Sequence, residues 1–109
     1  NVIYFGDALY KFERQATFDS SKSNSFALAV GDLNGDGFED IVVGNAGEPN
    51  AVFINPKNGK AWMKIQLSEE RFETYDIMTV DLNGDGRLDI LESNSDELNK
   101  YYFNLKTSK

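Results

Sequence analysis

The chain has 109 residues and a formal net charge of −7, and 40% of its residues are hydrophobic, which is typical of one small globular domain or part of one. The excess of carboxylates disfavours binding to nucleic-acid phosphates, and no apolar run approaches the roughly 18 residues of a membrane-spanning helix. Because cysteine and histidine are both absent, thiol chemistry, Cys/His zinc sites and serine–histidine catalysis are excluded.

Short apolar segments bounded by Gly, Asn, Pro or Asp follow one another along the chain and predict β-strands. The first segment contains residues 3–5. Four more cover residues 25–31, 40–44, 50–55 and 61–67, with turn signals between them. The C-terminal part repeats this order, with strand-like segments at 76–80 and 89–93 and an aromatic run at 101–103. No window has the 3.6-residue apolar period of a long helix.

An internal repeat organises these segments. The string DLNGDG occurs at residues 32–37 and 81–86, so the two copies are 49 residues apart. Residues 32–60 and 81–109 are identical at 14 of 29 positions, far more than unrelated sequences share. Four strands in a repeat of this length are typical of a β-propeller blade. We therefore predict an all-β fold built from four-stranded antiparallel propeller blades.

The repeat divides the chain into a partial blade (residues 1–24), a full blade (25–73) and a second partial blade (74–109). These units supply about two repeats, whereas a propeller ring needs at least about four blades. The ring is therefore incomplete unless copies of the chain self-associate or the chain belongs to a longer propeller. The first residue is Asn rather than Met, which also indicates a processed chain or a fragment.

Each DLNGDG string opens a nine-residue loop with oxygen-bearing side chains at positions 1, 3, 5 and 9. These candidate metal ligands are Asp32, Asn34, Asp36 and Asp40 in the first loop, and Asp81, Asn83, Asp85 and Asp89 in the second. Position 7 would add a backbone carbonyl, from Phe38 or Arg87. Many hard oxygens suit Ca²⁺ better than Mg²⁺, and three carboxylates this close repel one another unless a cation lies among them. The sequence predicts two Ca²⁺ ions per chain, and plain Asn-Gly or Asp-Gly turns are the alternative.

The second loop also fits the EF-hand pattern, with Glu92 at its twelfth position. The first loop has Val43 at that position and does not fit the pattern. Both loops have strand-like flanks where an EF-hand has helices. A helical EF-hand or dockerin-like calcium module stays open as an alternative.

An apolar strand, the pattern D-x-N-G-D-G-x-x-D-[IL] and a β-branched strand together resemble the FG-GAP/VCBS repeats of the integrin α-chain propeller and of many bacterial secreted proteins. The segments GDLNGDGFEDIVVG and VDLNGDGRLDILES both carry the pattern. The resemblance implies a calcium-stabilised propeller that is extracellular, on the cell surface or periplasmic. It also implies adhesion, or binding of a protein or carbohydrate ligand. Family propellers usually carry about seven repeats in one chain, more than are present here.

Alternation of strand direction places both metal loops on one face of the blades, and loops 45–50 and 94–99 on the other. On this second face, Glu48 and Glu97 are candidates for hydrogen bonding to a sugar or for binding a partner's cations. Trp62 is a candidate sugar-stacking residue, because it belongs to a fourth strand, which lies at the outer rim of a blade. We expect a binding module and no enzyme, because each clustered Asp is explained as a metal ligand. The propeller part of a polysaccharide-acting enzyme is the alternative.

Overall fold

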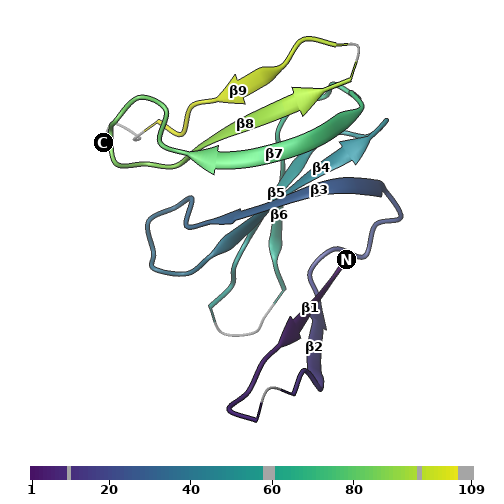
Figure 1. Cartoon of the computed structure of the whole chain (residues 1–109), viewed down its shortest axis with the longest axis vertical. Coiled ribbons are helices and arrows are strands. Elements are labelled where there is room, and N and C mark those ends of the chain that lie inside the picture. The colour runs from purple at the N-terminus through teal and green to yellow at the C-terminus, as the bar shows by residue number, and fades with distance from the viewer. Residues whose placement is uncertain (10, 58–60, 96, 106–109) are drawn as a thin grey trace.

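The structure is a computed structural model that describes residues 1–9, 11–57, 61–95 and 97–105, and over these ranges the chain forms β-strands and no helix (Figure 1). The strands are β1 (Val2–Phe5), β2 (Arg14–Thr17), β3 (Asn24–Gly31), β4 (Asp40–Ala46), β5 (Ala51–Ile54), β6 (Met63–Gln66), β7 (Thr74–Val80), β8 (Asp89–Asn94) and β9 (Lys100–Tyr102). The all-β prediction is confirmed. In the part of the chain that is described, no helix is long and apolar enough to cross a membrane.

The strands form three antiparallel sheets that follow the order of the sequence: β1-β2, then β3-β4-β5-β6, then β7-β8-β9. The middle sheet is a four-stranded meander, as predicted for a whole blade, and the outer sheets have two and three strands. Figure 1 shows the sheets one after another, from purple through teal to yellow, without closure into a ring. The prediction of incomplete propeller blades is confirmed.

The core between the middle and third sheets depends on small residues in the inner strands. Its buried members are Leu33, Val42, Val52, Ile77 and Ile90. Gly44 in β4 allows the close approach of β7, because a Cβ atom at this glycine would lie 2.8 Å from side-chain atoms of both Ile77 and Thr74. A larger residue would push the two blades apart.

A second core joins the first two sheets around Phe18, Val43, Ala51 and Phe53. The rings of Phe18 and Phe53 meet edge to face, with centroids 5.2 Å apart. Trp62 is half-buried and packs on Phe18, with ring centroids 5.9 Å apart. The indole considered for sugar stacking is therefore partly covered by the protein's own core.

One face of β3 carries exposed apolar side chains. Phe26, Leu28 and Val30 are 61%, 58% and 55% exposed. Leu28 lies opposite Val43 in the ladder, so this face points toward the first sheet. Because the first sheet has only two strands, it covers the outer part of the middle sheet and leaves this face of β3 uncovered.

The helical EF-hand alternative is wrong. The second loop is flanked by β7 and β8. Glu92, the residue that completes the EF-hand pattern, lies within β8 and is 2% exposed. Its carboxylate accepts hydrogen bonds from the side chains of Asn50 and Asn94, in the seam between two sheets.

Candidate metal centre

The two acidic loops join the first and second strands of adjacent sheets and lie on the same side of the molecule (Figure 1). The first connects β3 to β4 and the second connects β7 to β8. The glycines at loop positions 4 and 6 have left-handed φ angles, which are +73° and +86° in the first loop and +73° and +84° in the second. Residues with a Cβ atom rarely adopt these angles, which explains the two glycines in each loop.

The aspartate at position 1 organises each loop around itself. Asp32 accepts backbone N–H groups of Gly35 and Asp36 on Oδ1, at 2.9 and 3.1 Å, and that of Gly37 on Oδ2, at 2.7 Å. Asp81 accepts the same three hydrogen bonds in the second loop, at 2.8 to 3.2 Å. The backbone of each loop is thereby wrapped around the carboxylate at its first position.

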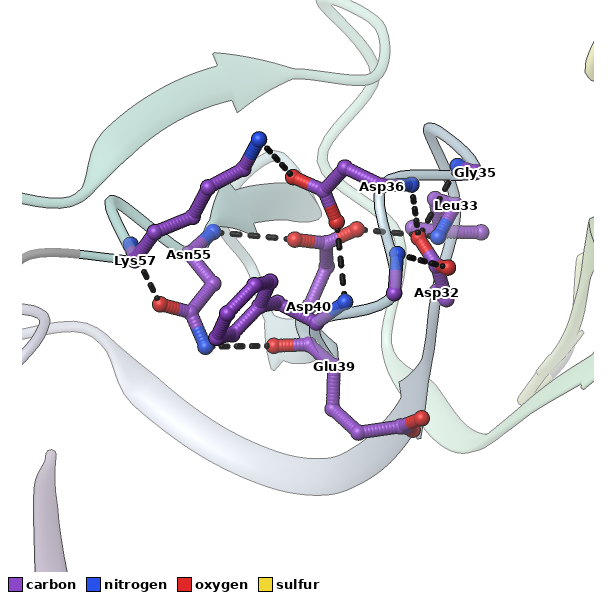
Figure 2. A network of polar contacts seen from close by, with 10 residues as sticks. Asp32, Leu33, Gly35, Asp36, Glu39, Asp40, Asn55 and Lys57 are labelled. Atoms are coloured by element: carbon purple, nitrogen blue, oxygen red, sulfur yellow. Dashed lines mark hydrogen bonds and ion pairs between the residues drawn. The ribbon is translucent and has the colours of Figure 1, made fainter.

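The aspartate at position 9 ties each loop to the strand ladder. Asp40 has no exposed surface, and it accepts the backbone N–H of Leu33 on Oδ2 and that of Asn55 on Oδ1, both at 2.9 Å (Figure 2). Asp89 is also fully buried and accepts the equivalent two hydrogen bonds, at 2.9 and 2.8 Å. Both oxygens of each carboxylate therefore hold backbone groups in place before any metal is considered.

Backbone N–H groups favour the ionised form of two loop carboxylates, those of Asp36 and Asp81. The backbone N–H of Phe38 donates to Asp36 at 3.0 Å and lowers the pKa of this carboxyl, desolvation opposes the shift, and the Lys57 ammonium adds to it. The backbone N–H of Gly86 is the largest cause that lowers the pKa of Asp81. Metal ligation requires deprotonated carboxylates, so these backbone contacts favour the binding-competent state.

Three carboxylates converge at the second loop. One oxygen from each of Asp81, Asp85 and Asp89 lies within 4.8 Å of the other two. Among the described residues, this convergence is found at the second loop and not at the first. Carboxylate and amide oxygens with this spacing fit a hard cation such as Ca²⁺, and the chain has no cysteine or histidine that could offer a softer ligand.

The FG-GAP-like repeat family matches residues 32–92, from the first residue of the first loop to β8, which is more than half of the chain. The chain belongs to the FG-GAP-like repeat family. This match confirms the predicted resemblance and indicates a propeller-type repeat module. No curated protein and no solved structure matches the chain.

The remaining predicted ligands of this FG-GAP-like chain lie on the loops. Asn34 and Asn83 at position 3 are exposed. The Phe38 side chain is 44% exposed, and the Arg87 side chain donates to the backbone oxygen of Asn104 at 3.2 Å. At position 7 only the backbone carbonyl is a predicted ligand, so the two side chains can differ between the loops. Ligation by these asparagines and by the two position-7 carbonyls stays a prediction.

Sequence reasoning gave no site role to two asparagines that follow the third strands. Asn55 donates its side-chain N–H to the backbone oxygen of Glu39 at 3.0 Å. Asn104 donates its side-chain N–H to the backbone oxygen of Leu33, in the first loop, at 2.5 Å. Asn104 therefore connects the third sheet to the first acidic loop. The signal was present in the sequence, since both positions are Asn in the 49-residue repeat.

The opposite loops of the FG-GAP-like module use their asparagines for their own closure. Asn50 accepts the backbone N–H of Asn45 at 2.7 Å, and Asn99 accepts that of Asn94 at 2.8 Å. Glu48 forms an ion pair with Arg71, at 2.8 Å. Glu97 is exposed. The side chains of Glu48 and Glu97 stay candidates for ligand binding on this face.

Proposed function

We propose that the chain is a calcium-binding propeller module, in which two Ca²⁺ ions brace the loops between the first and second strands of adjacent blades. The observation that carries the proposal is the convergence of Asp81, Asp85 and Asp89 within 4.8 Å. Ca²⁺ would supply the positive charge that offsets the mutual repulsion of these carboxylates. The same positions recur in the first loop as Asp32, Asp36 and Asp40.

Each loop residue has a separate task in this proposal. The position-1 aspartates hold the loop in a wrapped shape, and the position-9 aspartates hold it to the strand ladder. The position-3 asparagines and the carbonyls of Phe38 and Arg87 would complete the oxygen set. The ion then acts as a brace for the fold, and the chain is not itself an enzyme, because every loop aspartate is committed to backbone contacts or to metal.

The module is proposed to belong to a secreted, cell-surface or periplasmic protein and to serve adhesion or binding of a protein or carbohydrate ligand. Membership of the FG-GAP-like repeat family supports this assignment. Calcium sites in extracellular modules can be weak, with Kd of about 10⁻⁴ to 10⁻³ M, and the millimolar calcium outside cells fills even such sites. A metal-braced scaffold would leave the opposite loops, with Glu48 and Glu97, as the binding face.

Calcium is expected to raise the melting temperature strongly. At a free calcium concentration about ten times Kd, each filled site adds about 1.4 kcal/mol by mass action. Two such sites would raise Tm by about 10 °C or more in a domain of this size. The measurement is thermal melting followed by circular dichroism, in EDTA and in calcium, with isothermal titration calorimetry for the number of bound ions.

The matched variants are Asp85→Ala, which removes an exposed ligand of the second loop, and Glu69→Ala, which removes the same charge from an exposed position outside both loops. Asp85→Ala should reduce the bound ions from two to one, and Glu69→Ala should leave both. Equal melting temperatures with EDTA and with calcium would overturn the proposal, as would two ions still bound by Asp85→Ala.

A further inference from the structure

A lysine side chain lies at the first acidic loop, at the place where a metal ion would neutralise charge. The Lys57 ammonium is 3.5 Å from Oδ2 of Asp36, and it lies 6.0 Å from the ring centre of Phe38 (Figure 2). The Asp36 side chain is only 14% exposed, whereas that of Lys57 is 52% exposed. The cation therefore approaches a largely covered ligand from the solvent side.

The backbone directs Lys57 to this place. Within the described ranges, it is the one residue other than glycine with a positive φ angle, at +68°. Such an angle is uncommon for a residue with a Cβ atom and indicates that the surroundings impose it. The backbone N–H of Lys57 donates to Oδ1 of Asn55 at 2.9 Å. The backbone N–H of Asn55 in turn donates to the buried carboxylate of Asp40, so the turn that carries the lysine is tied to a second loop ligand.

The arrangement of the carboxylates differs between the two loops. In the second loop, three carboxylate oxygens converge within 4.8 Å, and in the first loop, also fully described at these positions, they do not. In the first loop, Oδ1 of Asp36 is occupied by the backbone N–H of Phe38, and Oδ2, its other oxygen, faces Lys57. The ammonium thus holds the oxygen that would otherwise be free for a metal.

We propose that Lys57 is a built-in competitor of calcium at the first loop, so that calcium binds there only by displacing the lysine ammonium from Asp36. This inference rests on the proposed function, because it concerns the affinity of the same loop. The lysine partly offsets the carboxylate charge of the metal-free loop, and it lowers the affinity for the ion that replaces it. An exposed ion pair changes an equilibrium constant by about two- to five-fold, which sets the expected size of the effect.

Isolation of the first loop makes the test specific. The Asp85→Ala background removes a ligand of the second loop, so that calorimetric titration with calcium reports the first. In this background, Lys57→Gln should lower the calcium Kd by about two- to five-fold. Lys22→Gln is the matched control, because Lys22 is exposed and its loss changes the net charge equally. Lys57→Arg keeps the cation and should not tighten binding.

Melting temperatures give an independent readout, because the effect of the substitution should differ between the metal-free and the calcium-bound states. In EDTA, Lys57→Gln should melt below its background, because the carboxylates lose their counter-charge, and in calcium this deficit should vanish or reverse. Lys57→Asn is the second variant, since asparagine tolerates a positive φ angle and keeps the turn folded. The inference would be overturned, with calcium binding left intact, by one result. This is a calcium Kd for both Lys57→Gln and Lys57→Asn that is equal to or larger than the Kd for Lys22→Gln. A complete absence of calcium binding in the unsubstituted chain would overturn both proposals.

Discussion

Replacement of Asp89 by alanine is expected to destabilise the fold by about 3 kcal/mol or more, even with all calcium removed by EDTA. Asp89 has no exposed surface, and its two oxygens accept the backbone N–H groups of Leu82 and Asn104, at 2.9 and 2.8 Å. Alanine leaves both donors without this acceptor, at a cost of about 1 to 3 kcal/mol for each one that stays buried. Urea unfolding in EDTA, followed by circular dichroism, measures the loss.

Asp85→Ala is the control for this prediction. Asp85 is an exposed ligand candidate of the same loop, and its carboxylate accepts a local hydrogen bond from the backbone N–H of Arg87, at 3.0 Å. In EDTA this variant should change stability by no more than about 1 kcal/mol. In calcium, by contrast, both variants should lose the stabilisation of the second ion. Similar stabilities of the two variants in EDTA would contradict a structural role of Asp89 beyond metal ligation.

Replacement of Glu92 by alanine is expected to cost about 3 kcal/mol or more, because it removes a buried acceptor from the seam between the middle and third sheets. The side-chain N–H groups of Asn50 and Asn94 donate to its two oxygens, at 3.1 and 2.9 Å. Asn50 also donates to Thr74, whose hydroxyl donates to Asn94, at 2.8 and 2.6 Å. The loss would be measured by urea unfolding.

Calcium affinity separates this role of Glu92 from that of an EF-hand ligand. Glu92→Gln keeps the side-chain shape and one acceptor oxygen, so it should lose less stability than Glu92→Ala. Both folded variants should bind calcium at the second loop with the affinity of the unsubstituted chain, because the carboxylate lies in the sheet seam. A large loss of calcium affinity in Glu92→Gln, with stability preserved, would show that this carboxylate ligates the ion.

The wrapped shape of the acidic loops is a local property, so it could be predicted from sequence. Asp32 contacts backbone groups only three to five positions further along the chain, and the glycines between them permit the left-handed angles. The 49-residue repeat then indicated that the second loop would have the same shape, and Asp81 makes the same contacts. Strand order also followed, because four short antiparallel segments joined by tight turns form a meander.

Contacts between residues far apart in the chain were decided only by the tertiary structure. The pattern around Glu92 matched an EF-hand, but its partner Asn50 lies 42 positions away on the neighbouring sheet. Apolar alternation predicted a strand at residues 25–31 but not the exposure of Leu28, which depends on how many strands the adjacent sheet supplies. The approach of Lys57 to Asp36 likewise depends on a turn after β5 being folded back beside the first loop. The conformation of each turn is therefore determined by neighbouring residues. The polar seam and the uncovered face of β3 depend on how one sheet packs on the next, and the contact of Lys57 with the first acidic loop depends on the assembly of the middle sheet.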